Sequence, residues 1–169
     1  MHVVFETERL LLRQFSEDDA ALILQLNSDP EVLKYLHEPI VETEERAREI
    51  LKDIIIPQYK LNLGRWATFT KDDNTFIGWC GLKYRPELNE IDLGYRFTRP
   101  SWGKGYATES ASHTLDYGLK TLKLDTITGR AHVKNTASIK VLEKIGMKYI
   151  GEGIVDNCPV KTYIAQRSI

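Results

Sequence analysis

WGKGYATE, residues 102–109, joins a predicted strand to a predicted helix and is the most informative stretch of the chain. Apolar and polar residues alternate over 90–97, which predicts a strand, and apolar residues recur at helical spacing over 105–120. Glycines between these elements let the backbone approach a ligand closely, and the first turn of a helix offers unpaired N–H groups. The segment therefore predicts an anion site, with phosphate as the expected occupant; a plain strand-to-helix turn is the alternative.

Two common nucleotide-binding patterns do not fit this segment. A dinucleotide fingerprint needs Gly or Ala at the position of Thr108, followed by an acidic residue at the end of the next strand. A P-loop needs Ser or Thr directly after Gly-Lys, where this chain has Gly105. The predicted anion site is therefore of another kind.

Hydrophobic periodicity and turn residues predict the other elements. We expect strands over residues 9–15, 65–70, 75–84, 126–133, 148–152 and 160–165. We expect helices after Ser16 and after Thr43, the second of which bends or ends near Pro57, and a further helix over 136–145. This order predicts a mixed α/β or α+β sheet with both faces covered.

Composition excludes several classes of protein. A chain of 169 residues without a linker, repeat or low-complexity tract is expected to form a single domain, residues 1–169. The net charge of -1 gives no general reason to bind nucleic acid or an anionic membrane. No apolar run approaches the ~18 residues of a membrane span, and the first residues lack the core of a signal peptide. Cys80 and Cys158 match no metal-ligand spacing, so we expect a cytoplasmic protein without a metal.

Three blocks of the chain resemble the GNAT superfamily of N-acetyltransferases, in particular its RimJ/RimL-like branch. Gly105 and Ala107 match the small positions of the acyl-CoA loop pattern Gln/Arg-x-x-Gly-x-Gly/Ala. Trp102 replaces the first residue of that pattern, as is usual in the branch. Residues 135–147, NTASIKVLEKIGM, resemble the branch's Asn-x-x-Ser-x-Lys/Arg-Val-Leu-Glu-Lys-x-Gly-Phe, and residues 7–13 resemble its opening strand. The resemblance implies a mostly antiparallel central sheet of about six or seven strands.

The resemblance also implies acetyl-CoA as cosubstrate, with its pyrophosphate on the backbone amides of the loop. The residues that it assigns to CoA are Gly103, Lys104, Gly105, Tyr106, Ala107, Thr108, Asn135, Ser138 and Lys140. Asn135 also suits a role as N-cap alone, and Lys104 and Lys140 also suit solvated surface positions. For Trp102 we expect packing beneath the loop rather than contact with ligand.

Catalytic residues follow less directly from the resemblance. Many members of the superfamily carry a Tyr that acts as the catalytic acid, seven residues after the Asn of the second block. In this chain that position is Leu142. Ser138 is the substitute that the resemblance suggests as proton donor to the CoA thiolate. A carboxylate or the water that it holds is the expected base, and Glu90 and Asp92 share the polar face of 90–97. The alternative for Glu90 and Asp92 is that they simply face solvent as the polar residues of an alternating strand. Glu109 is expected to have a structural role.

The expected reaction is direct transfer of acetyl from acetyl-CoA to a primary amine. A protein N-terminal α-amino group and a small-molecule amine, such as an antibiotic or a polyamine, both fit this reaction. The protein is expected to be a monomer or a homodimer. A non-catalytic acyl-CoA-binding module is the alternative from another class. Acceptor contacts are expected from residues 16–62 and 84–89, and the near-zero net charge predicts that a basic acceptor would be selected by a local acidic cleft.

Overall fold

A single eight-stranded sheet forms the centre of the computed structural model, which describes residues 2–168. The strand order is β1-β2-β3-β4-β5-β6-β8-β7, and every neighbouring pair is antiparallel except β5–β6. The strands are β1 Val3–Glu6, β2 Leu10–Gln14, β3 Gly64–Thr70, β4 Phe76–Arg85, β5 Glu90–Phe97, β6 Thr126–His132, β7 Lys148–Val155 and β8 Cys158–Gln166. The mixed, mostly antiparallel sheet is confirmed, with one strand more than expected.

The additional strand is β1, which pairs with β2 at the edge of the sheet. It has only four residues, none of them buried, so it carries no alternation by which a strand is recognised. At the opposite edge, β7 and β8 extend beyond the expected ranges into a long hairpin that turns at Asp156 and Asn157, both at positive φ.

Two helices cover one face of the sheet. The first, α3 Tyr106–Asp116, continues as a wider π-helical turn, η5 Tyr117–Thr121, and the second is α4 Thr136–Lys144. Their apolar residues join the larger core with strand residues from β2 to β8; its members include Leu10, Leu12, Trp66, Leu82, Leu93, Ala111, Leu115, Ile127, Leu142 and Met147. A Cβ on Gly129 would come within 3.0 Å of Leu142 and Met147, so the glycine lets α4 approach β6 closely.

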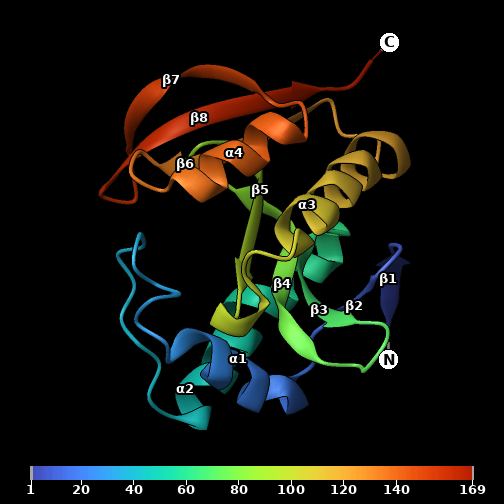
Figure 1. Ribbon diagram of the computed structural model, residues 1–169, viewed down its shortest axis with the longest axis vertical. Coiled ribbons are helices and arrows are strands. Elements are labelled where there is room, and N and C mark those ends of the chain that lie inside the picture. Colours follow the sequence, from blue (N-terminus) through green and yellow to red (C-terminus); the bar gives the residue numbers. More distant parts are fainter. Residues whose placement is uncertain (1, 169) are drawn as a thin grey trace.

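The other face is covered by helices from the first third of the chain. The 3-10 turn η1 Glu17–Asp19 leads into α1 Ala20–Asn27, and α2 Glu44–Ile50 continues as the π-helical turn η2 Leu51–Ile55 and the 3-10 segment η3 Ile56–Leu61. Pro57 lies in the first turn of η3, where the helix changes type near the expected position. Their apolar side chains form a second core with Ala67, Phe69, Phe76 and Trp79. Figure 1 shows α1 and α2 at one end of the molecule, β7, β8 and α4 at the other, and α3 between them.

The single parallel pair of strands is short. β4 and β5 are paired along all eight residues of β5, whereas β5 and β6 pair only at Asp92–Thr128 and Leu93–Gly129. Beyond these residues the strands diverge toward their carboxyl ends, so residues 94–97 of β5 have no partner on the β6 side. We call this divergence the splay; α3 follows β5 and α4 follows β6 at its open end (Figure 1).

The Thr43 side chain accepts a hydrogen bond of 3.1 Å from Arg46 N, which confirms its expected role as N-cap of α2. Replacing Thr43 by Ala leaves that N–H without its side-chain acceptor, so we expect the free energy of unfolding to fall by about 1 kcal/mol. Urea denaturation of the variant measures this change. Thr43→Ser is the matched control, and equal losses in the two variants would contradict the cap.

Candidate functional site

The loop between β5 and α3 has the backbone geometry expected of an anion site. A 3-10 turn, η4 Arg99–Ser101, leads into it, and Gly103 and Gly105 have φ of 75° and 81°, which favour glycine. Gly105 is the N-cap of α3 and supplies no side-chain acceptor, so the first N–H groups of the helix have no cap. A Cβ on Gly103 would meet nothing within 4 Å, so space is open beside the loop.

Trp102 is placed differently from the expectation. Its side chain is 47% exposed instead of packed beneath the loop. The indole N–H donates to the Phe97 carbonyl at 2.9 Å, which ties the start of the loop to the end of β5. The hydrogen bond, and not burial, therefore sets the position of this side chain.

A clamp from the β1–β2 turn holds the loop on its outer side. The Arg9 guanidinium donates to Glu109 Oε1 at 2.7 Å and to the Lys104 carbonyl at 2.9 Å, and it lies 4.5 Å from the centre of the Tyr106 ring. Glu109 Oε2 also accepts from Thr7 Oγ1 at 2.5 Å and from Arg9 N at 2.9 Å. Glu109 thus joins α3 to a segment about 100 residues earlier, as befits the structural role expected for it.

These contacts also determine the ionisation of Glu109. Burial opposes the charged form, but the hydrogen bonds from Thr7 and Arg9 outweigh it and lower the pKa of Glu109 below its ordinary value. The Glu109 carboxylate is therefore charged at neutral pH, and the Arg9 guanidinium offsets its negative charge beside the loop.

The start of α4 brings Ser138 against a tyrosine of β5. The Asn135 side chain accepts from Ser138 N at 3.2 Å, so Asn135 caps α4. The Ser138 hydroxyl lies 2.7 Å from the Tyr95 hydroxyl, a hydrogen bond that crosses the splay. Tyr95 was not predicted as a site residue, because its apolar alternation with Leu93 and Phe97 indicates only a core position. Burial raises the pKa of Tyr95 to about 12, so its phenol is a neutral donor at ordinary pH.

Two further positions of α4 behave as the sequence indicates. Leu142 is 1% exposed and lies in the larger core, so no acid occupies the position where many superfamily members carry Tyr. Lys140 is exposed and, among the described residues, forms no ion pair.

The two candidate carboxylates lie at different depths of the sheet. Glu90, at the start of β5, forms an ion pair of 2.7 Å with Arg130 of β6. Asp92 occupies the last-but-one paired position before the splay, with an Arg85 nitrogen 3.5 Å from its carboxylate. Burial raises the pKa of Asp92, although Arg85 and Lys83 lower it in part. Asp92 is therefore the better placed of the two to take a proton at the splay.

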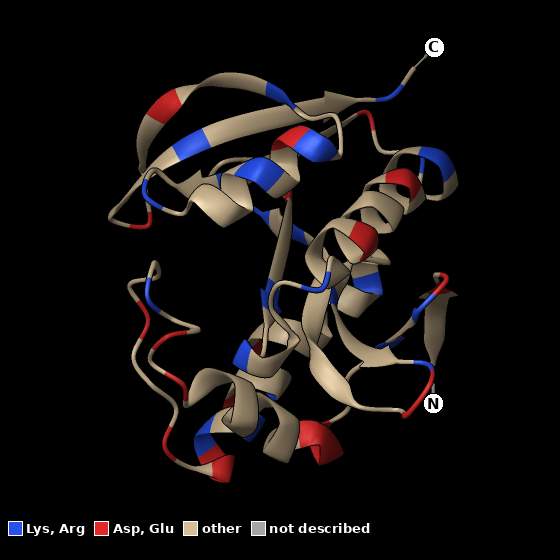
Figure 2. Ribbon diagram, viewed as in Figure 1, with Lys and Arg blue, Asp and Glu red and all other residues tan. Residues whose placement is uncertain are grey.

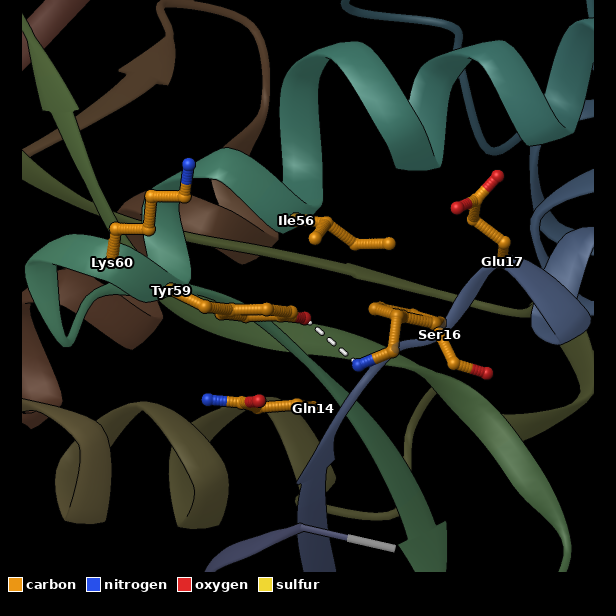
Figure 3. Close-up of a pocket in the computed structure, with 7 residues that line it drawn as sticks. Gln14, Ser16, Glu17, Ile56, Tyr59 and Lys60 are labelled. Atoms are coloured by element: carbon orange, nitrogen blue, oxygen red, sulfur yellow. Dashed lines mark hydrogen bonds between the residues drawn. The ribbon is translucent and has the colours of Figure 1, made fainter.

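Two hollows of the described surface are not lined by any of these candidate residues. One, about 500 Å³ in volume, is lined by Gln14, Phe15, Ser16, Glu17, Ile56, Tyr59 and Lys60 (Figure 3). At its base the Tyr59 hydroxyl accepts from Phe15 N at 2.9 Å and donates to the Arg65 carbonyl at 2.6 Å. This hollow therefore lies where Tyr59 of η3 joins the residue after β2 to β3. The other is lined mostly by apolar side chains, together with Asn62 and Tyr84; the apolar ones are Leu61, Leu63, Ile91, Leu122 and Leu124.

Residues 2–168 contain neither a membrane-spanning helix nor a cluster of metal ligands. No helix in this range is both long and apolar enough to cross a membrane. Within the same range, no three His, Cys, Asp or Glu side chains are grouped as ligands for a metal ion.

Comparison with known proteins agrees with the geometry. A family model described as an acetyltransferase (GNAT) domain matches residues 9–148. An uncharacterized N-acetyltransferase, p20, from Bacillus licheniformis is 33% identical over 86% of this chain and 82% of that protein. A solved GNAT-family acetyltransferase from Bacillus anthracis has a TM-score of 0.81 at 28% identity, covering 98% of both chains. RimL, a ribosomal L7/L12 alpha-N-protein acetyltransferase solved with coenzyme A, has the same fold, with a TM-score of 0.83 at 16% identity over 98% of both chains.

The clamp predicts a pH-dependent loss of stability in Glu109→Gln. At neutral pH the free energy of unfolding of the variant should be lower by about 1–3 kcal/mol, because charge-assisted hydrogen bonds are lost. Because the folded pKa of Glu109 is lowered, its contribution is complete above the ordinary value of 4.5 and disappears as the pH falls through the lowered value. Urea denaturation of both proteins from pH 7 to pH 3 measures this difference.

The matched control is Glu49→Gln, which removes an exposed ion pair within α2. That change should cost no more than about 0.5 kcal/mol. A Glu109→Gln difference that stays constant down to pH 3 would show that the charge of Glu109 does not hold the clamp.

Proposed function

The chain belongs to the acetyltransferase (GNAT) family, and we propose that it binds acetyl-CoA at the splay and transfers the acetyl group directly to a primary amine. The observation that carries the proposal is the pair of diverging parallel strands, each followed by a helix that begins at the open end. An extended ligand with a pyrophosphate at one end and a thioester at the other suits this arrangement. Its phosphates lie at the start of α3 and its thioester lies where β5 and β6 meet.

Backbone groups supply most of the cofactor contacts in this proposal. The amides of residues 103–108 bind the pyrophosphate, favoured by the positive end of the α3 dipole. The free edge of residues 94–97 in β5 pairs with the amides of the pantetheine arm, as an added strand would. Asn135 keeps its amide nitrogen for the same arm while its oxygen caps α4, and Lys104 and Lys140 provide charges for phosphates.

The hydroxyl pair of Tyr95 and Ser138 supplies the proton for the leaving group. One of the two hydroxyl protons forms the hydrogen bond between Tyr95 and Ser138, and the other can be donated to a third group. In the reaction, the amine nitrogen attacks the thioester carbonyl carbon and the carbon–sulfur bond breaks. The thiolate leaves with the electron pair and takes a proton from the hydroxyl pair. The attacking nitrogen releases one N–H proton to solvent, from which the hydroxyl pair is reprotonated.

Asp92 is the base in this proposal, directly or through a water that it holds. An ammonium has no lone pair, so the acceptor must lose a proton before it attacks. The raised pKa of Asp92 strengthens it as a base, whereas Glu90 is held by Arg130.

Neither cysteine suits a covalent acetyl-enzyme. Cys80 is 0% exposed and burial raises the pKa of its thiol to about 11; Cys158 is 6% exposed. A buried thiol is a poor nucleophile and cannot reach a substrate. Their placement supports direct transfer, for which positioning of amine and thioester supplies much of the rate.

Ala107→Leu tests the loop assignment. A larger side chain in the first turn of α3 blocks the approach of a pyrophosphate, so we expect the affinity for acetyl-CoA to fall at least 10-fold in calorimetry. Ala21→Leu on the exposed side of α1 is the control and should bind as the wild type does. Wild-type affinity in Ala107→Leu, with an unchanged melting temperature, would remove the loop from the proposed site.

Ser138→Ala and Tyr95→Phe test the hydroxyl pair. Ser138→Ala should lower turnover by up to about 100-fold, because the thiolate loses its donor. Tyr95→Phe should lower it less, because Ser138 keeps a proton of its own. Release of CoA thiol measures turnover, and KM for acetyl-CoA should change little in either variant. Wild-type turnover in Ser138→Ala would exclude this serine as the donor.

A further inference from the structure

The face of the sheet beneath the thioester position places two cations without an ion-pair partner beside Asp92. Arg65 of β3 and Lys83 and Arg85 of β4 lie around Asp92 of β5, on the face that α1 and α2 flank. Lys83 is the register partner of Asp92, and Arg65 acts electrostatically on both. Figure 2 shows Lys and Arg positions on the central strands in the middle of the molecule. We call Arg65 and Lys83 the basic floor.

The two cations of the basic floor lack the partners that neighbouring arginines have. Arg85 binds Asp156 at 2.6 Å and Glu87 at 2.9 Å, besides its contact with Asp92. Among the described residues, neither Arg65 nor Lys83 forms an ion pair. Asp92 and Glu38 act on Arg65 from beyond ion-pair distance, and Glu38 pairs directly with Arg96. Neither cation of the basic floor therefore has a carboxylate in direct contact among the described residues.

Burial makes the charged forms of Arg65 and Lys83 costly. Burial, with a further contribution from Arg96, lowers the pKa of Arg65 to about 10. Burial also lowers the pKa of Lys83, and repulsion by Arg65 and Arg85 adds to it. Partly desolvated cations without a direct ion-pair partner are stabilised when an anion binds to them.

A second observation on the same face points to a missing acceptor. Arg130 uses only Nη2, in its pair with Glu90. Its Nε and Nη1 are buried and have no hydrogen-bond partner among the described residues. Buried donors of native proteins are generally satisfied, so the β6 side of this face also has donors to spare.

The basic floor is held rigidly beside the splay. The Arg65 guanidinium lies 4.5 Å from the centre of the Trp79 ring, a cation–π contact that fixes its position. Asp92 occupies the last-but-one paired position before β5 and β6 diverge. On the opposite face Leu142 and Met147 close over Gly129, so an acceptor reaches the splay from the side of the basic floor.

We propose that the acceptor is an amine that also carries an oxyanion, a carboxylate or a phosphate, and that Arg65 and Lys83 bind this group while the amine faces Asp92. The mixed site matches such a molecule, with a base for the amine next to cations for its anion. Polyamines and aminoglycosides, which carry only positive charge, do not fit it. The inference rests on the proposed acetyl transfer and names its substrate class.

Matched pairs of amines test the proposal in the wild-type protein. The first pair is glycine and glycinamide, which differ in one carboxylate. The second is phosphoethanolamine and ethanolamine, which differ in one phosphate, and spermidine is the cationic arm. Calorimetry in the presence of CoA gives the affinity for each amine, and thiol release with acetyl-CoA gives kcat/KM. We expect at least 10-fold tighter binding of the anionic member in at least one pair, and that pair identifies carboxylate or phosphate.

Lys83→Met and Arg65→Gln identify the residues responsible. Each should raise KM for the anionic acceptor at least 10-fold and leave KM for acetyl-CoA and the neutral amine within about 2-fold. Lys120→Met, at an exposed lysine after α3, is the control. Melting temperatures show whether the variants fold; if neither does, the wild-type pairs decide.

Two outcomes would overturn this inference, and a third concerns the function itself. Equal or weaker binding of both anionic members, or preference for spermidine, overturns the oxyanion and leaves acetyl transfer standing. If both variants keep the wild-type preference for the anionic amine, the basic floor does not recognise the acceptor. Absence of acetyl-CoA binding would instead overturn the proposed function, and this is measured separately from the amines.

Discussion

Two paired positions between β5 and β6 determine the shape of the site. Parallel neighbours cannot be joined by a tight turn, so the chain must leave β5, cross one face and return to β6. That crossover contains the glycine loop and α3. Because both strands run in the same direction, the helices that follow them begin at the same edge of the sheet. If the pairing extended along both strands, hydrogen bonds of the sheet would occupy the edge that a ligand needs.

Charge is distributed unevenly in a molecule whose total is nearly zero. The 23 basic and 24 acidic residues predict no field over the whole surface. Strand register nevertheless places Lys83 beside Asp92, and it brings Arg65 of the preceding strand to the same neighbourhood. Composition predicted only that a basic acceptor would be selected by a local acidic cleft, and it gave no sign of the cations that lie beside Asp92. The sign of a local site depends on which residues neighbouring strands bring together.

The elements with strong local signals could be predicted from the sequence. β5 was predicted with both of its bounds, because the alternation over 90–97 is uninterrupted and glycines and prolines follow it. β1 was missed, because four half-exposed residues at an edge have no period to read. The π-helical turns at 51–55 and 117–121 were missed as well, because a wider turn leaves the apolar spacing nearly helical. Tyr95 and Arg65 became candidates only when pairing showed their neighbours, since nothing local distinguishes them from other strand residues.

The clamp of Arg9 on the loop makes the first residues of the chain part of the cofactor-binding region. Thr7 and Arg9 belong to a turn at the edge of the sheet, and they hold the segment whose amides face the proposed phosphates. Docking of this edge and binding at the loop are then thermodynamically linked, and each strengthens the other by the same factor. Any event that displaces the amino-terminal hairpin, such as cleavage, fusion to another chain or pairing of β1 with a foreign strand, would then change the affinity of the proposed loop site without contact with its ligand.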